Sequence, residues 1–237
     1  MKIKKLISAL VLGSMLVGLS GCNITDFSAE NLLRPPKAVG DEAEIEQLIA
    51  KTADSGYTLK YPKNGKFRSA IIMTDLDGND SNEAVAFFRN SAETSSVHML
   101  VMYSKDNSWE IASDNIFETT DIDSVDFADL TGNGKAEIIV NSTTYTPNVG
   151  KLSCYSYTEG KTNEVGSGQS CSSFVTGDFD NDGTSEIMSL VLYTTENEAL
   201  ASMLDYNEDS KSLYAKAMAN MDPNLSLIHI SEPTRPL

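Results

Sequence analysis

The chain has 237 residues, of which 41% are hydrophobic, so it can bury the core of one large domain. Acidic residues outnumber basic ones by 34 to 18, which gives a formal net charge of −16. Nucleic acid and anionic membrane surfaces repel a chain this acidic, so we expect neither as a binding partner.

The first 21 residues resemble the signal peptide of a bacterial lipoprotein. A basic start over residues 1–5 precedes an apolar stretch, residues 6–19, that is short for a bilayer span. The stretch ends at Leu19-Ser20-Gly21-Cys22, which resembles a lipobox, where cleavage before the cysteine leaves its thiol to carry a diacylglycerol. The alternative is an ordinary secretory signal with a chance cysteine.

The lipobox resemblance implies an exported protein, anchored to a membrane on the extracytoplasmic face of a bacterial cell. Two or three acyl chains on Cys22, palmitate among them, would hold it there stably, where one chain would not. Removal of the signal takes away three lysines and no acid, which changes the formal net charge from −16 to −19.

A tether and a short helix are predicted next. Residues 22–40 form the tether, because Arg34-Pro35-Pro36-Lys37 cannot be helical before its prolines. Residues 41–56 contain a short amphipathic helix that begins at Asp41, which we expect to be the N-cap. We expect the apolar face of this helix to dock onto the domain that follows. This face consists of Ile45, Leu48 and Ile49.

From residue 57 to residue 224 the pattern is that of β-structure. Runs rich in β-branched and aromatic residues are separated by turn clusters such as Lys105-Asp106-Asn107. No second long helix is evident, so the sequence predicts an all-β fold. The predicted strands are residues 68–74, 84–88, 97–104, 108–112, 124–128, 137–143, 150–157, 172–176, 186–193, 199–206 and 212–217.

One acidic loop occurs three times in this region, each time directly before a hydrophobic strand. The copies begin at Asp75, Asp129 and Asp178. Oxygen-bearing side chains at positions 1, 3, 5 and 9, with the backbone carbonyl of position 7, suit a hard cation such as Ca²⁺. Small residues at positions 4 and 6 permit the tight turn. The alternative is that these loops are Asx-turns that cap strands without a metal.

The loop differs from an EF-hand, which has its closing glutamate at position 12 and helices on both sides. It resembles the FG-GAP/VCBS repeat of integrin-type β-propellers, Asp-x-Asp-x-Asp-Gly-x-x-Asp followed by a strand. The resemblance covers residues 65–220, and the copies are 54 and 49 residues apart, with about four strands in each interval. It implies a partial β-propeller of about three four-stranded blades from a ring of about seven.

The resemblance also implies which residues bind the metal, and two to three Ca²⁺ ions are expected. The third loop has the most carboxylates, whereas Asp80 stands where the family has glycine in the first loop. The second loop has Thr131 at position 3 and is expected to bind more weakly. The implied ligands are Asp75, Asp77, Asn79, Ser81 and Glu83, then Asp129, Thr131, Asn133, Lys135 and Glu137, then Asp178, Asp180, Asp182, Thr184 and Glu186.

Residues that could carry out catalysis are scarce. His98 lies inside a predicted strand, and the sequence contains no nucleophile elbow, phosphate loop or dinucleotide fingerprint. Trp109 with three tyrosines could form a sugar-binding platform, or these aromatic residues could simply pack within strands. The tyrosines concerned are Tyr103, Tyr155 and Tyr157.

The sequence thus favours a protein that is not an enzyme. We expect an extracellular binding, adhesion or scaffold module on the cell surface, with a protein or glycan as its ligand. One alternative is a fragment of a propeller-based polysaccharide lyase whose catalytic residues lie outside this chain. Another is a structural lipoprotein without a small ligand.

Two further features are left open or set aside. The sequence does not decide whether Cys154 and Cys171 pair or remain separate thiols. Residues 225–237 are expected to be a non-native tail, since Leu225 to Arg235 resembles the translation of a sequencing adapter; the alternative is a native tail. The first interpretation implies that the natural gene continues and that this chain is an N-terminal fragment.

Overall fold

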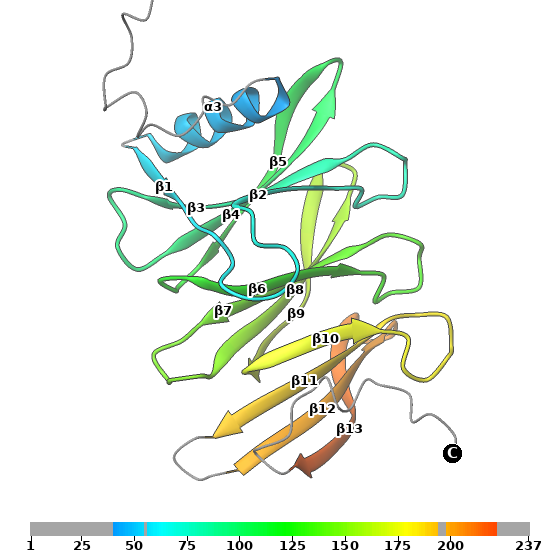
Figure 1. The fold of residues 1–237 in the computed structure, drawn as a ribbon. Helices are drawn as coiled ribbons and strands as arrows, with labels where there is room; N and C mark the ends of the chain where they lie inside the picture. Colours follow the sequence, from blue (N-terminus) through cyan, green and yellow to red (C-terminus); the bar gives the residue numbers. More distant parts are fainter. Residues whose placement is uncertain (1–39, 55, 194–197, 222–237) are drawn as a thin grey trace, which may run out of the picture. The chain divides into compact units, whose positions relative to one another are not determined.

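The computed structural model describes residues 40–54, 56–193 and 198–221, all of which belong to one compact unit (Figure 1). The predicted signal peptide, Cys22, the tether before residue 40 and the predicted tail lie outside the described residues. The described part contains one helix and is otherwise built of strands. None of its helical residues forms a segment both long and apolar enough to span a bilayer.

The strands form three antiparallel sheets, each built on a four-stranded meander. This is an all-β, partial propeller-like fold, as the sequence predicts. The first sheet contains β2 (Ile71–Thr74), β3 (Glu83–Asn90), β4 (Val97–Lys105) and β5 (Ser108–Phe117). The second contains β6 (Ile122–Ala128), β7 (Glu137–Thr143), β8 (Gly150–Thr158) and β9 (Lys161–Cys171). The third contains β10 (Ser173–Gly177), β11 (Glu186–Tyr193), β12 (Glu198–Asn207) and β13 (Ser212–Met221).

A further short strand, β1 (Tyr57–Leu59), completes the edge of the first sheet. The four residues of β2 pair with only the first half of β3, from Glu83 to Ala86. Strand β1 pairs with the remaining part of β3, from Phe88 to Asn90. Two short strands in tandem therefore satisfy the backbone groups along one side of β3.

The central strands of the first two sheets are buried on both faces, because the first sheet packs between helix α3 and the second sheet, and the second packs between the first and the third. In β3, Val85 and Phe87 belong to the apolar cluster shared with the second sheet, whereas Ala86 faces helix α3. In β7, Ile138 faces the first sheet and Ile139 the third. Alternate residues of a strand point to opposite faces, so two-sided burial requires the continuous apolar runs that follow each acidic loop.

Helix α3 (Asp41–Ala53) covers the face of the first sheet that does not contact the second sheet. Ile45 and Ile49 are fully buried there, and Glu44 accepts the backbone N–H of Trp109 at 3.0 Å. The predicted docking of the apolar face is confirmed. The prediction that Asp41 is the N-cap is wrong: Gly40 takes that place with φ of 64°, and no side chain caps the helix.

Most predicted strands agree with the structure to within a few residues, but β1 and β9 were not predicted. Strand β9 is polar and contains Gly166 and Gly168, and only Val165 and Cys171 among its residues are buried. It forms because β8 offers a complete row of backbone partners, with two register shifts along the pair. Gly166 is needed because Leu213 of the third sheet lies against it: an added Cβ would meet Leu213 Cδ1 at 2.8 Å.

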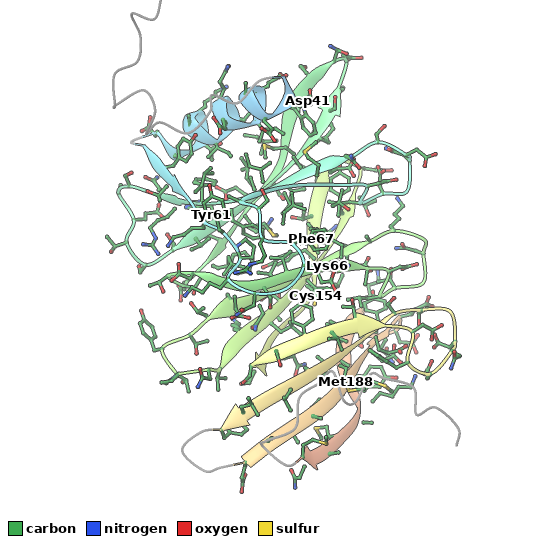
Figure 2. All side chains as sticks on the ribbon, viewed as in Figure 1. Asp41, Tyr61, Lys66, Phe67, Cys154 and Met188 are labelled. Carbon is green, nitrogen blue, oxygen red and sulfur yellow. The ribbon has the colours of Figure 1, made fainter. Side chains whose placement is uncertain are left out.

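The two cysteines of the described region are separate thiols, which decides the alternative that the sequence leaves open. Cys154 and Cys171 are free and fully buried in the apolar cluster between the second and third sheets. Cys154 is labelled in Figure 2. Burial raises the pKa of both thiols, that of Cys171 to about 12. Both therefore stay protonated and unreactive near neutral pH.

Candidate metal centres

The three acidic loops occupy the same place in each sheet. They connect β2 to β3, β6 to β7 and β10 to β11, which are the first two strands of each meander. The glutamate at position 9 is in each case the first residue of the second strand. The loops are therefore short connections whose two ends are held by a paired strand ladder, which keeps position 1 close to position 9.

The loops share one pattern of internal hydrogen bonds. The carboxylate of Asp75 accepts the backbone N–H groups of positions 4, 5 and 6, and those of Asp129 and Asp178 accept positions 5 and 6, at 2.7–3.2 Å. The side-chain oxygen at position 5 accepts the N–H of position 7 at 2.7–2.8 Å, in Asn79, Asn133 and Asp182. These Asx-type turns fix the positions of the side-chain oxygens without a metal.

The closing glutamates are the buried members of each loop. Glu83, Glu137 and Glu186 are at most 3% exposed, and the Oε2 of each accepts the N–H of position 2 at 2.8 Å. Burial, followed by the charges of neighbouring aspartates, raises the pKa of each carboxyl, that of Glu137 to about 7. An ionised carboxylate in such a place is costly unless a positive charge lies beside it.

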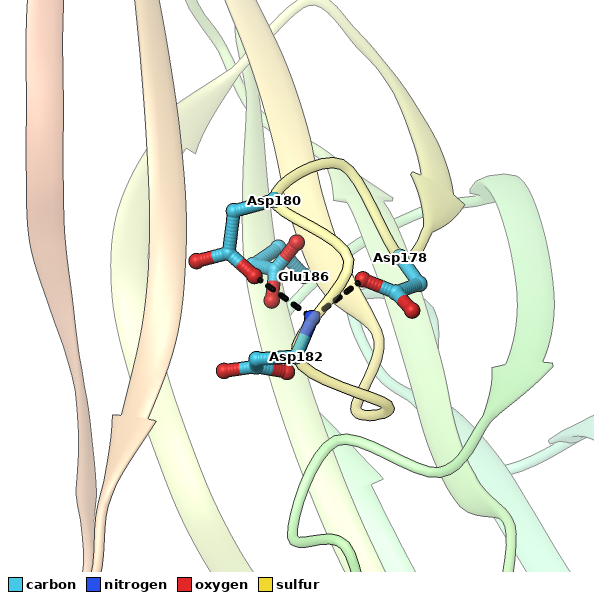
Figure 3. A group of neighbouring side chains, drawn as sticks. All are labelled: Asp178, Asp180, Asp182 and Glu186. Carbon is cyan, nitrogen blue, oxygen red and sulfur yellow. Dashed lines mark hydrogen bonds between the residues drawn. The ribbon is translucent and has the colours of Figure 1, made fainter.

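The third loop presents four carboxylates to one point, and Figure 3 shows them around the backbone nitrogen of Asp182. One oxygen from each lies within 4.8 Å of the others. Glu186 is fully buried, and within the described part of the chain its Oε1 has no hydrogen-bond partner. A buried, unpaired carboxylate oxygen among further carboxylates fits a divalent cation with oxygen ligands. The group consists of Asp178, Asp180, Asp182 and Glu186.

The first loop repeats this arrangement with three carboxylates. Asp75, Asp77 and Glu83 bring oxygens within 4.8 Å of one another. The Oδ1 of Asp77 is buried and finds no hydrogen-bond partner among the described residues. Asp80, at the position where glycine is usual, has φ of 64°, so the turn is made with an aspartate in the left-handed region.

The second loop differs, because Asp129 and Glu137 are its only carboxylates at positions 1, 3, 5 and 9. The hydroxyl of Thr131 donates to Glu137 Oε1 at 3.3 Å, so both oxygens of this glutamate accept a hydrogen bond. Among the described residues, this loop forms no group of three acids. The weaker binding expected of the second loop stays a prediction.

The residues at position 7 take part in the turn through their backbone N–H groups. Each donates its N–H to position 5, which leaves its carbonyl outside that hydrogen bond. In the third loop the hydroxyl of Thr184 also donates to Asp182 Oδ1 at 2.5 Å. These residues are Ser81, Lys135 and Thr184.

Contacts between successive loops could not be predicted from the motif. The N–H at position 8 of the second loop, Ala136, donates to Leu76 O of the first at 3.0 Å. Likewise Ser185 of the third loop donates to Asp129 O of the second at 2.8 Å. The loops therefore touch across both sheet boundaries, and a Cβ added to Gly132 would lie 2.7 Å from Thr184 Cγ2.

The motif also does not predict that Lys216 of β13 contacts the third loop. Its Nζ lies 2.5 Å from Asp180 Oδ2 and 2.9 Å from Asp205 Oδ2. Lys216 is 36 positions away from Asp180 in the chain. Only the pairing of β13 with β12 brings its side chain to the loop.

The histidine and the aromatic residues that the sequence singles out serve packing. His98 is buried, stacks on Phe88 at 4.8 Å between ring centroids, and has carboxylates at both ring nitrogens, Asp114 at 2.9 Å and Glu93 at 3.2 Å. Trp109 belongs to the cluster under helix α3, whereas the two buried tyrosines belong to the cluster between the first and second sheets, against which the partly buried Tyr103 also packs. The four aromatic residues thus form no common platform. These tyrosines are Tyr155 and Tyr157.

Comparison with known proteins adds no relative. No protein-family model matches the chain, and no curated protein matches it either. The resemblance to FG-GAP/VCBS repeats therefore depends on the three loops and on the place of each loop in its sheet.

Proposed function

We propose that this chain is a calcium-stabilised binding or scaffold module of FG-GAP/VCBS type, carried by an exported lipoprotein. The observation that carries the proposal is one loop geometry repeated in three successive sheets, with unpartnered buried oxygens on Asp77 and Glu186 among the described residues. Bound Ca²⁺ would supply the positive charge that these oxygens lack.

The loops support a structural role for the ions. Each loop contacts the next through a backbone hydrogen bond, from Ala136 to Leu76 and from Ser185 to Asp129. An ion bound by positions 1, 3, 5 and 9 would fix the conformation of its loop. The next loop along the chain contacts that loop, so its position would be fixed as well. Calcium is therefore expected to strengthen the packing of sheet on sheet, as well as each turn.

The surface around the β7–β8 connection supports a binding role. Two hollows of about 460 and 560 Å³ lie beside residues 144–149, and hydroxyl and amide side chains line much of both. Tyr145 of this connection is 93% exposed. Such polar hollows beside an exposed aromatic ring suit an extracellular protein or glycan ligand.

Calorimetric titration of the full chain with Ca²⁺ tests the metal sites. We expect uptake of about two to three ions and a melting temperature that falls in chelator, by the linkage that stabilises any state to which a ligand binds. The variant Glu186→Gln should lose one site, while Mg²⁺ should bind more weakly, because it demands a stricter geometry. Absence of uptake, with equal melting temperatures in calcium and in chelator, would overturn the proposal.

The lipid anchor has a separate test, supported by the motif that ends at Cys22. Expression of the full chain in a bacterium with radiolabelled palmitate should label the protein and place it in the detergent phase on phase separation. Cys22→Ala should abolish both. Equal labelling of the variant and the parent chain would remove the lipoprotein part of the proposal and leave the metal sites untouched.

A further inference from the structure

Lys216 places a positive charge on the third acidic loop from another part of the sheet. Its Nζ contacts Asp180 Oδ2 at 2.5 Å and Asp205 Oδ2 at 2.9 Å. The side chains of Asp180 and Lys216 are each about one-third exposed, whereas that of Asp205 is 12% exposed. The lysine therefore links a candidate cation ligand to a more buried carboxylate of β12.

A β-bulge directs Lys216 toward the loop. In the pairing of β12 with β13, Leu204 lies opposite Ala215 and Met203 lies opposite Ala217, so the register leaves Lys216 as the extra residue. A bulge of this kind re-aims the side chain of its extra residue. The position of the ammonium is thus set by the strand pairing and not by the acidic loop.

Asp205 holds the lysine independently of the loop. Its Oδ1 accepts the N–H of Tyr206 at 2.7 Å, and its Oδ2 accepts the hydroxyl of Tyr214 at 3.1 Å as well as the ammonium. The carboxylate of Asp205 is therefore fixed by three groups. If the ammonium of Lys216 leaves Asp180, Asp205 keeps it nearby. Release of Asp180 therefore requires only a small movement of one long side chain.

The first and third loops can be compared directly, because both have an aspartate at position 3. At position 3 of the first loop, Asp77 has a buried Oδ1 without a partner in the described residues. At the same position of the third loop, neither carboxylate oxygen of Asp180 is without a partner: Oδ2 accepts from Lys216 and Oδ1 accepts the N–H of Asp182 at 3.2 Å. Yet Glu186 Oε1 in the third loop still lacks a partner within the described region, so one ammonium does not satisfy the group.

We propose that Lys216 competes with a divalent cation for Asp180 and thereby sets the cation affinity of the third loop. The inference rests on the proposed function of this loop as a cation site. A cation that takes Asp180 Oδ2 must displace the ammonium, and one that binds beside it meets a like charge at close range. The first loop, with fewer carboxylates but no lysine on Asp77 in the described residues, therefore binds Ca²⁺ more tightly than the third.

The test is a Ca²⁺ titration of the full chain, followed by NMR at the amides of Gly183 and Gly78, which report the third and first loops through their bonds to Asp178 and Asp75. Lys216→Met should raise the affinity at Gly183 about tenfold, as expected from removing one screened repulsion at contact distance. The affinity at Gly78 should stay unchanged.

Three further variants separate the effect of charge from an effect on structure. Lys216→Arg keeps the positive charge and should leave the affinity within about threefold of the parent value. Lys161→Met removes one exposed charge at the start of β9 and should leave both loops unchanged. Far-UV circular dichroism and a melt in chelator check the fold, and Lys216→Gln, which retains a donor for Asp205, replaces the methionine variant if that variant unfolds.

The outcomes distinguish this inference from the proposed function. Equal affinity at Gly183 in the parent chain, Lys216→Met and Lys216→Gln, with Ca²⁺ bound, overturns the role of the lysine and leaves the metal sites standing. A titration that moves neither glycine in any of these proteins overturns both. Binding at Gly183 only after removal of the lysine would support the inference in its strongest form.

Discussion

Thr131 Oγ1 donates a hydrogen bond to Glu137 Oε1 across 3.3 Å. The corresponding oxygen of the third loop, Glu186 Oε1, has no partner in the described chain. The second loop thus satisfies from within an oxygen whose counterpart in the third loop has no partner among the described residues. The residue at position 3 decides this difference, because a threonine can donate a hydrogen bond and an aspartate cannot.

Thr131→Asp should therefore turn the second loop into a site like the first. The substitution removes the internal donor and adds a third carboxylate beside Asp129 and Glu137, so we expect Ca²⁺ affinity at this loop to rise at least about tenfold. Calorimetry should show one additional or tighter site. Thr131→Val, which removes the donor without adding a ligand, is the matched control and should not tighten binding.

The stability of the metal-free protein should fall as pH rises from about 4.5 to about 7. Burial raises the pKa of Glu137 from 4.5 to about 7, so the folded state binds a proton that the unfolded chain releases across this interval. The pKa values of Glu83 and Glu186 are raised in the same direction. The stabilisation is complete below the unfolded value and is lost as pH passes the folded one.

Urea midpoints at pH 5 and pH 7.5 measure this effect, first in metal-free buffer and then with saturating Ca²⁺. The decline should shrink or reverse with Ca²⁺, because the ion favours the ionised carboxylates. Glu137→Gln should remove its share of the decline. A metal-free stability that rises over this interval would contradict the prediction.

Contact between loops makes Gly132 less replaceable than Gly134. Both have positive φ, 69° and 78°, but a Cβ on Gly132 would meet Thr184 Cγ2 at 2.7 Å whereas one on Gly134 would meet nothing within 4 Å. Gly134→Ala should cost about 1–2 kcal/mol from backbone strain alone. Gly132→Ala should cost about 1–2 kcal/mol more, since overpacking adds to the same strain.

A double-mutant cycle with Thr184→Ser isolates the steric part. Serine lacks the methyl group but keeps the hydroxyl that bonds Asp182, so it should restore much of the extra loss in Gly132→Ala and little in Gly134→Ala. Urea unfolding supplies the free energies. Equal costs for the two glycine substitutions would show that the second and third loops do not touch in solution.

The cluster between the first and second sheets should dominate stability. Phe87 is fully buried in it, and Phe87→Ala should cost about 3–5 kcal/mol through lost burial and the cavity left behind. Ile116, on strand β5 of the same sheet, is 58% exposed. Ile116→Ala is the control and should change the unfolding free energy by about 0.5 kcal/mol or less. Similar losses in the two variants would argue against sheet-on-sheet packing.

Local interactions explain which parts of the fold could be predicted. The candidate ligands of each loop lie within nine residues, and its Asx-turns and closing glutamate are set by the same short segment, so the motif alone indicates the candidate site. The apolar runs of β7 and β11 predict their bounds correctly, because two-sided burial leaves no polar alternation to confuse the pattern. Strand β9 carries no such signal, since its outward residues are polar and its backbone partners come from β8.

The sequence by itself therefore determined an all-β chain with three acidic loops, each placed before a buried strand, and a helix from Asp41 to Ala53. Only the tertiary structure decided that this helix covers the first sheet, that successive loops contact one another, and that Lys216 lies on Asp180. The physical reason is range. Side chains a few positions apart are brought together by local backbone geometry, whereas residues 36 positions apart meet only through strand register, and one extra residue in β13 aims the lysine at the loop.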